Sequence, residues 1–490
     1  DADSQGLRMA ERDVSPDPVS PSPIAADFLN NNHFEKNLYY ASSIPGSDTL
    51  DRFVWGFINS THSVYNKITT NFTLPEIAQG GAERLMLALV GYTNDPTNPN
   101  DHRAVVKING VEVADVNWDG REWKIIDVPL PTNLLTVGSN QLEIFGPNAF
   151  FDVFYFDWFE IESNQLFYAK SDAIDFNFPE TGAKQQFMVN GFSTETIAAY
   201  DISIGNKPVL LTGLSIQSDA EDLFDVKFED TIDPDMRYWV STMSNLLSSN
   251  AIIKDIPSDL SNESNEADYL VITHELFESS TELNDLMNLR SSQGLQVKKV
   301  NVQDIYDEFN HGFPDATAIK NFLEYTYYQW TKAPSIVLLV GDGHYNPKNY
   351  SPGKEGFGRT SFIPPYLSMV DPIIGETASD NRYVTFVGED NLPDMLIGRL
   401  AVNSNEEVSA FINKIVEYEG SIIDGDWNLS VTLAADNPDG SGNFQHSSEY
   451  LRSCCIHDYY QQDRIYLGTT YSTADLARSA LITSINEGKF

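Results

Sequence analysis

The pattern of apolar and polar positions changes near residue 266. Between residues 31 and 163, short alternating or aromatic runs are separated by clusters of Asp, Asn, Pro and Gly, which predicts strands. The run "FDVFYFDWFEIE" (151–162) is so apolar that both of its faces should be covered. Asn109-Gly110 stands between two alternating segments and predicts a β-hairpin. We therefore expect an all-β sandwich of the jelly-roll kind over 31–163.

Two other segments lie beside this predicted sandwich. Residues 164–265 carry further short alternating runs and end in a polar stretch, which predicts a small β module and a junction. Residues 1–30 include "VSPDPVSPSPIA", where prolines stand among serines. Such a composition is typical of an extended linker or arm, so we expect no core element there.

Beyond residue 266, buried strands alternate with amphipathic helices. "DYLVITH", "LQVKKVNV" and "SIVLLVGD" have the length and apolar content of strands, and helical patterns such as "DATAIKNFLEYTYYQWTK" separate them. Alternating strands and helices indicate a mainly parallel sheet with covered faces. The sequence thus predicts a multidomain protein whose α/β domain occupies 266–490. Ligands of such sheets bind beyond the carboxyl ends of the strands, here Thr273-His274, Gly341-Asp342 and Ala435-Asp436.

Composition narrows the classes of function. The 490 residues are 41% hydrophobic and carry 31 Lys and Arg against 71 Asp and Glu, a formal charge of −40. This charge repels phosphate backbones, so nucleic acid is not an expected partner. No stretch approaches the ~20 apolar residues of a membrane-spanning helix. The first residues lack a signal-peptide pattern, so we expect any such peptide to have been removed from a secreted protein.

The loop after "SIVLLV" is the main candidate for chemistry. "GDGHYNPKNYSPGKEG" lacks the spacing of a phosphate-binding loop. Three interpretations of Asp342 stay open: a cap of the loop, a carboxylate that faces a substrate pocket, or a calcium ligand. Asp380 in "ETASDNRYV" and Asp390 in "GEDNLPDMLIGRL" are the other calcium candidates. The second run has the composition of a calcium loop but not the spacing of an EF-hand.

The two cysteines, Cys454 and Cys455, are adjacent. They cannot form an ordinary disulfide framework, and the absence of HExxH and CxxC patterns argues against zinc. In "EYLRSCCIHDYY", Leu451, Cys455 and Tyr459 share the spacing of one helix face. We therefore expect these thiols to be small buried apolar groups rather than nucleophiles.

Some surface and core residues also carry expectations. Trp55, Trp118, Trp123 and Trp158 are expected in the core rather than in a carbohydrate-binding surface. Five Asn-X-Ser/Thr triplets permit glycosylation, which fits an extracellular or cell-surface protein. Their asparagines are Asn59, Asn71, Asn262, Asn349 and Asn428.

Several stretches, in this order, resemble gingipain-type cysteine peptidases. They are "ADYLVITH", "QGLQVKKVNVQDIYDEFNHGFPDATAIKNFLEY", "IVLLVGDGHYNPKNY", "ETASDNRYV", "LPDMLIGRL" and "KIVEYE". That family includes secreted proteases and sortase-like surface enzymes of a bacterial secretion system, and the earlier β modules look like domains that precede the catalytic region in the latter. The resemblance implies a caspase-like α/β fold in which a cysteine thiolate attacks a peptide carbonyl and a histidine transfers the proton.

The resemblance implies no catalytic residue within this chain. The family's histidine stands on the strand after the helix that here reads "ADLARSALITSINEGK", and its cysteine on the next strand, so both are expected beyond Phe490 and the α/β domain is expected to be incomplete. His311-Gly312 matches a different stretch, and Cys454 and Cys455 precede the expected histidine strand.

The resemblance makes Asp342, His344 and Asp380 candidates for a substrate pocket, and Asp342, Asp380 and Asp390 for calcium. The expected partner is a peptide or protein substrate, with no required cofactor and with calcium as the candidate ion. The alternative is an acidic, glycosylated surface or filament-forming protein. In that case carbohydrate binding or self-assembly would be its role, and the peptidase-like domain would be inert.

Overall fold

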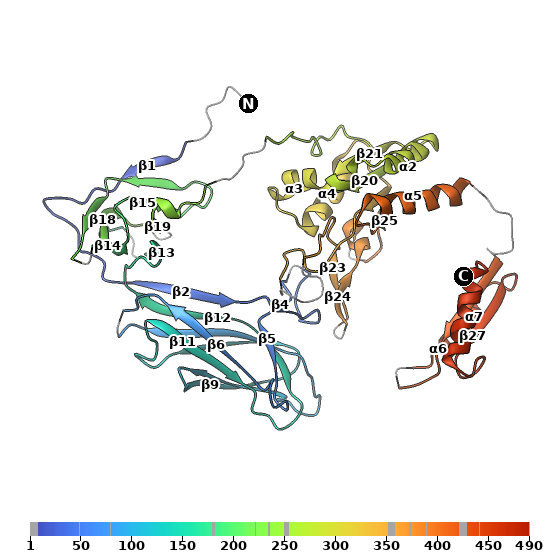
Figure 1. The fold of residues 1–490 in the computed structure, drawn as a ribbon, viewed down its shortest axis with the longest axis horizontal. Coiled ribbons are helices and arrows are strands. Elements are labelled where there is room, and N and C mark those ends of the chain that lie inside the picture. The colour runs from blue at the N-terminus through green and yellow to red at the C-terminus, as the bar shows by residue number, and fades with distance from the viewer. Residues whose placement is uncertain are drawn as a thin grey trace. The chain divides into compact units, whose positions relative to one another are not determined.

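The computed structural model describes residues 8–48, 50–78, 80–178, 182–220, 222–233, 236–248, 254–350, 358–371, 374–388, 390–420, 429–440 and 442–489. Figure 1 shows strand-rich segments toward the N-terminus and helices with short strands toward the C-terminus. The chain divides into two compact units, Asp1–Asn405 and Glu406–Phe490. The division falls inside the predicted 266–490 domain.

Two antiparallel sheets share the first hydrophobic core. Leu85, Leu87 and Leu89 from one sheet and Ile144 from the other are all fully buried in it. The first sheet contains β10 (Trp123–Pro129), β7 (Glu83–Gly91), β12 (Val153–Gln165) and β2 (Phe28–Glu35), with β5 (Gly56–Asn59) paired to β12. The second contains β6 (Lys67–Leu74), β11 (Gly138–Phe145), β8 (His102–Ile108) and β9 (Val111–Trp118). The strand-rich prediction is confirmed, and the jelly-roll connection stays a prediction.

Two local predictions hold in this region. β8 and β9 form a hairpin whose turn residues, Asn109 and Gly110, have φ of 50° and 81°. A tight two-residue turn requires this left-handed conformation, which Asn and Gly adopt readily. Every side chain of β12 is buried or half-buried, because β7 lies on one edge, β2 and β5 lie on the other, and the core covers one face.

β12 also carries a buried carboxyl group. Its pairing with β7 shifts register between Phe156 and Phe159, so Asp157 lies at an irregularity of the strand. Asp157 is 9% exposed, and its Oδ1 has no hydrogen-bond partner among the described residues. Burial, reinforced by the charges of Glu35 and Asp51, raises the pKa of Asp157 to about 7.

A second β module has its own aromatic core, in which Phe176, Phe187, Phe228 and Tyr238 contact one another. One of its sheets contains β1 (Ala10–Asp13), β16 (Val209–Thr212), β15 (Ile197–Asp201), β19 (Arg237–Thr242) and β13 (Ala173–Asn177). The other contains β14 (Lys184–Phe192), β18 (Phe224–Thr231) and β17 (Ser215–Ser218). A 3-10 turn, η1 (Met243–Asn245), follows β19.

The expectation that residues 1–30 contribute no core element is wrong for part of that segment. β1 pairs in parallel with β16, and Val14 is 1% exposed within the core of the second module. Arg12 forms ion pairs with Asp201 and Asp230 of the same module. The prolines begin only at Pro16, so the residues before them keep the backbone N–H groups that a strand needs.

The α/β region of the first unit contains a fully parallel sheet. In spatial order its strands are β21 (Val297–Asn301), β20 (Tyr269–Thr273), β22 (Ile336–Val340) and β25 (Leu396–Leu400). Its helices are α1 (Glu275–Glu278), α2 (Thr281–Ser292), α3 (Val302–Asn310) and α4 (Ala316–Gln329). Side-chain caps from Ser280 and Asp315 start α2 and α4. The parallel-sheet prediction is confirmed, and the caspase-like detail stays a prediction.

Two antiparallel hairpins complete the first unit near this sheet. β3 (Tyr39–Tyr40) pairs with β4 (Phe53–Val54) in the N-terminal part, and β23 (Leu367–Asp371) pairs with β24 (Gly375–Ala378) in the α/β region. The short η2 (Asp380–Val384) follows β24. Figure 1 shows the β23–β24 hairpin beside β4, and the hydroxyl of Tyr40 in β3 donates a hydrogen bond to Glu376 in β24.

The second unit is small. β26 (Ser430–Ala435) and β27 (Gln461–Tyr466) pair in parallel, and α6 (Phe444–Cys455) connects them. α7 (Ala474–Asn486) follows, and α5 (Asn405–Gly420) leads into the unit. Throughout the described ranges, the helices are too short or too polar to traverse a lipid bilayer.

Candidate functional site at the carboxyl ends of the parallel strands

The end of β22 lies very close to the segment 361–365. Gly341 has φ of 146°, and a Cβ on it would lie 2.8 Å from Cβ of Phe362. A Cβ on Gly343 would lie 2.5 Å from the carbonyl oxygen of Ile363. Only glycine permits both approaches without displacing the backbone, which explains the "GDG" sequence.

Asp342 stands between these glycines and has two roles. Its carboxylate accepts hydrogen bonds from the backbone N–H of Gly343 (2.9 Å) and from Nδ2 of Asn403 (3.2 Å), as a loop cap does. Asp342 also lines a cavity of about 470 Å³. The other lining residues among those described are Gly343, His344, Arg359, Thr360, Phe362 and Asn403. The cap and the pocket-facing position therefore coexist in one residue.

His344 lies in the same cavity wall. Its Nδ1 accepts a hydrogen bond from the backbone N–H of Asn346 (3.0 Å), so the proton of the neutral ring is on Nε2. Its own backbone N–H donates to Oγ of Ser361 (3.2 Å). His344 is thus held in place by its local loop and presents one wall of the cavity.

Asp380 is placed differently. It lies at the start of η2, and Arg399 of β25 binds both of its carboxylate oxygens, at 2.7 and 3.0 Å. Arg399 also donates to the carbonyl groups of Gly341, Ile363 and Pro364, at 2.9, 2.7 and 3.2 Å. Among the described residues, the lining of the strand-end cavity includes Asp342 and His344 but not Asp380. Asp380 instead orients the arginine that fixes the strand end.

Sequence reasoning missed Arg399. The signal was present, because "MLIGRL" places one arginine in an otherwise apolar strand, where an unpaired charge would be costly. Arg359 and Asn403 were missed as well, since neither belongs to a strand or helix whose pattern points to the cavity.

The predicted calcium ligands do not form a cluster. Oδ1 of Asp390 accepts a hydrogen bond from the backbone N–H of Leu392 (3.0 Å), which closes a local turn. Within the part of the chain that the structure describes, no three His, Cys, Asp or Glu side chains are arranged to hold a metal ion. Calcium at Asp342, Asp380 and Asp390 therefore stays a prediction.

The expectation that the two cysteines of the second unit are buried is wrong. Cys454 and Cys455 are free thiols and both are exposed at the end of α6. The helix packs through another face, where Gln445 donates to the carbonyl groups of Asp436 and Leu467. A hydrogen bond from Cys455 raises the pKa of the Cys454 thiol, the opposite of what a nucleophile needs.

The four tryptophans expected in the core are buried or half-buried, whereas most of the described glycosylation candidates are exposed. Trp55 and Trp118 are each 8% exposed, and Nε1 of Trp123 donates to the carbonyl of Pro45. Trp123 and Trp158 are half-buried. Of the glycosylation candidates, Asn71, Asn262 and Asn349 are exposed and Asn59 is half-buried. Asn428 lies outside the described residues, and glycosylation at all five stays a prediction.

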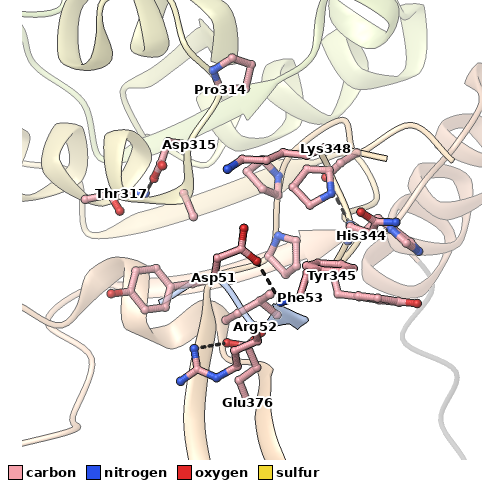
Figure 2. A pocket seen from close by; sticks show the side chains of 18 of the residues that line it. Asp51, Arg52, Phe53, Pro314, Asp315, Thr317, His344, Tyr345, Lys348 and Glu376 are labelled. Atoms are coloured by element: carbon pink, nitrogen blue, oxygen red, sulfur yellow. Dashed lines mark hydrogen bonds and ion pairs between the residues drawn. The ribbon is translucent and has the colours of Figure 1, made fainter. Parts of the chain in front are cut away.

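A second cavity, of about 640 Å³, adjoins His344 on the side of the β3–β4 hairpin. Figure 2 shows Arg52 paired with Glu376 at its base and Asp51 above them. The Arg52–Glu376 ion pair (3.0 Å) is almost fully buried, and the hydroxyl of Tyr40 donates to the same carboxylate (2.7 Å). Burial raises the pKa values of both Tyr40 and Glu376. These contacts join the N-terminal part of the first unit to its α/β region.

Comparison with known proteins places the α/β part in a class. Residues 262–490 match the profile of peptidase family C25. The match covers slightly less than half of the chain and supports the resemblance to gingipain-type cysteine peptidases that the sequence motifs carry.

Individual relatives are distant and much longer. Gingipain R2 of Porphyromonas gingivalis is 25% identical over 188 residues, which cover 36% of this chain and 21% of that protein. Gingipain R1 of the same organism is 24% identical over 176 residues, which cover 34% of this chain and 15% of that protein. The chain therefore matches a fifth or less of the length of these two curated relatives.

One solved structure shares the fold over nearly the whole chain. The crystal structure of dimeric latent PorU from P. gingivalis aligns with a TM-score of 0.60 and 15% identity, covering 91% of this chain and 44% of that one. Because 91% of this chain is covered, the shared fold includes the β modules as well as the α/β region.

Proposed function

We propose that the chain is part of a secreted or cell-surface cysteine peptidase of the gingipain type that acts on peptide or protein substrates. The observation that carries the proposal is the strand-end cavity within the family-matched region. Ligands of parallel α/β sheets bind at this edge, and the cavity has Asp342 and His344 in its wall.

The cavity is suited to a polar substrate side chain. The carboxylate of Asp342 and the guanidinium group of Arg359 lie in a lining that also includes the ring of Phe362. A side chain that enters could bond to the charged groups while its apolar part contacts the ring. The proposed role of Asp342 and His344 is therefore to hold substrate, and neither is assigned to bond cleavage.

The proposed chemistry is acyl transfer. A cysteine thiolate attacks the scissile carbonyl, the amine leaves with a proton from a histidine, and water then hydrolyses the thioester. Cys454 and Cys455 are exposed thiols with no sign of activation, so the nucleophile is proposed to be another cysteine of the whole protein. The reaction needs no cofactor.

The test measures peptide hydrolysis by the whole protein as its gene encodes it. We expect hydrolysis that iodoacetamide abolishes and that persists in the Cys454→Ser/Cys455→Ser variant. Asp342→Asn keeps an acceptor for the Gly343 N–H but loses the charge, and should raise KM by about tenfold for some substrates. Asp285→Asn, an exposed carboxylate on α2, is the matched control and should leave KM unchanged.

Three results would contradict the proposal. The first is hydrolysis that survives thiol alkylation, and the second is no hydrolysis of any peptide in a broad panel. The third is loss of activity in the double cysteine variant, which would show that the exposed pair is the nucleophile after all.

A further inference from the structure

The 640 Å³ cavity at the β3–β4 hairpin is larger than the strand-end cavity and has no assigned role. Its walls come from distant parts of the chain: the β3–β4 hairpin, the α3–α4 loop, the loop after β22, the segment before β23, and Glu376 of β24. The cavity is therefore formed by the packing of several separate segments and not by a single loop.

Aromatic contacts keep this cavity open in a defined shape. The ring of Tyr345 lies 4.5 Å from that of Tyr40 and 6.4 Å, nearly parallel, from that of Phe53. Phe53 also meets Tyr350 edge-on at 5.1 Å. Together with the buried Arg52–Glu376 pair, these rings fix the wall before any ligand arrives, which lowers the entropic cost of binding.

The charge of the lining is negative. Four acidic and two basic residues are among the described lining residues, and one pair, Arg52 with Glu376, neutralises itself. Three carboxylates, those of Asp48, Asp51 and Asp315, then remain against the single ammonium group of Lys348.

These carboxylates differ in how many of their oxygens already accept hydrogen bonds from the protein. Both oxygens of Asp48 accept hydrogen bonds from the β23 segment. Asp51 and Asp315 each use one oxygen, for the backbone N–H of Phe53 (3.0 Å) and of Thr317 (2.6 Å), and both residues are exposed. In Figure 2 the side chain of Asp51 extends toward the side of the cavity that holds Asp315 and Lys348. Each therefore keeps an oxygen for a ligand.

The ligand that fits is a basic side chain. A guanidinium or ammonium group would bond to the spare oxygens of Asp51 and Asp315, and its stem and charge would lie against the tyrosine and phenylalanine rings. An anion would meet net negative charge. Within the described ranges the carboxylates also do not converge as metal ligands do.

The two cavities are neighbours, since His344 lines both. An extended peptide that places one side chain in the strand-end cavity would therefore carry neighbouring residues past His344 toward Asp51 and Asp315.

We propose that this second cavity binds a basic side chain of the substrate peptide, several positions away from the side chain held at the strand end. The inference rests on the proposed function for the identity of the ligand, but its binding chemistry is independent of cleavage.

The test is a fluorescence-anisotropy titration with two labelled ten-residue peptides, identical except that one carries a single arginine and the other citrulline. The whole protein is treated with iodoacetamide beforehand, so that hydrolysis cannot remove the peptide. We expect the arginine peptide to bind about tenfold more tightly than the citrulline peptide, because charge-assisted hydrogen bonds are lost in citrulline.

Conservative variants locate the effect. Asp51→Asn/Asp315→Asn keeps both backbone caps and should abolish the preference for arginine. Lys348→Gln removes the opposing charge and should tighten arginine binding about threefold, so the proposal is tested even if the double variant does not fold. Glu112→Gln/Glu122→Gln removes the same charge from exposed positions of the N-terminal sandwich and should keep the preference.

Equal affinity for the two peptides would overturn the inference, as would an equal loss in the Glu112→Gln/Glu122→Gln control, which would assign the effect to the overall charge of −40. The two proposals fail separately. Arginine-dependent binding without thiol-dependent hydrolysis contradicts the proposed function alone, and hydrolysis without arginine-dependent binding contradicts the inference alone.

Discussion

Asp157 in the N-terminal sandwich and Asp380 in the α/β region show two ways to place a carboxylate in one protein. Asp157 lies in a central strand, buried, with Oδ1 unpartnered among the described residues. Asp380 lies outside the parallel sheet, where both of its oxygens are bound by Arg399. The sandwich therefore leaves one carboxyl oxygen of Asp157 without a partner among the described residues, whereas the α/β region pairs both oxygens of Asp380 with an arginine.

The difference teaches where each region can accept a charge. The central parallel strands β20 and β22 are buried almost throughout and carry no charged residue, and Asp342 follows β22 in the loop beyond its end. The sandwich strand carries its acid at a register shift, where the irregular backbone turns a side chain away from the regular alternation. At the strand end, by contrast, Asp342 lies in the wall of a cavity.

Removal of Arg399 should have the largest effect on stability. Arg399→Ala leaves the Asp380 carboxylate and the carbonyl groups of Gly341, Ile363 and Pro364 without their donor, in a site where the arginine side chain is only 12% exposed. We expect a loss of about 3 to 5 kcal/mol in the free energy of unfolding of the first unit, measured by urea denaturation.

The matched control is Arg84→Ala in the sandwich. Arg84 pairs with Asp127 across β7 and β10, but the two side chains are 51% and 34% exposed. Solvent screens such a pair, so its loss should cost far less stability than the loss of Arg399. A similar loss of stability in both variants would contradict the claim that burial makes the Arg399 contacts the stronger ones.

Asp157→Asn should change stability in a pH-dependent manner. The raised pKa of about 7, against an ordinary value of 3.8, means that the folded state holds a proton between pH 4 and 7 that the unfolded state has lost. The wild-type protein therefore loses stability as pH rises through this window, by up to ~4 kcal/mol, and asparagine does not. Unfolding midpoints at pH 5 and pH 8 measure the difference.

The variant should thus gain stability over the wild type at pH 8 and show a smaller gain at pH 5. Charges elsewhere titrate equally in both proteins and cancel in the comparison. A difference that is the same at both pH values would show that Asp157 titrates normally and that a partner satisfies it.

Gly341→Ala should have the smallest of these effects and should act at the site itself. The new Cβ would lie 2.8 Å from Cβ of Phe362, and the φ of 146° disfavours any side chain. We expect a loss of about 2 kcal/mol and an altered strand-end cavity, seen as a higher KM. Gly398→Ala in the adjacent strand β25 has open space around its Cβ and should change neither quantity, and an effect there equal to that of Gly341→Ala would refute the explanation.

Local patterns predicted much of the fold. The Asn109-Gly110 hairpin and the strands β20 and β22 follow from residues that are neighbours in sequence. β1 was missed because its partner, β16, lies almost 200 residues away and nothing in "AERD" reveals it. The short helix α3 was missed because it follows β21 directly, with Asn301 as both the last residue of the strand and the helix cap.

The site was predictable in part for the same reason. Asp342 and His344 end a buried strand, and both line the cavity there. Asp380 was expected to share that pocket, but its position depends on Arg399, whose reach across the strand end is a property of the assembled sheet. The second cavity could not be predicted, because it exists only where the β3–β4 hairpin meets the α/β region.

That meeting point also bears on the order in which the molecule is made. Tyr40 and Arg52 are synthesised long before Glu376. The β3–β4 hairpin can therefore form before the β23–β24 hairpin packs against it. A chimera that joined this α/β region to a foreign N-terminal part would bury the Glu376 carboxylate without its cation. The N-terminal part and the α/β region therefore depend on each other through this buried ion pair.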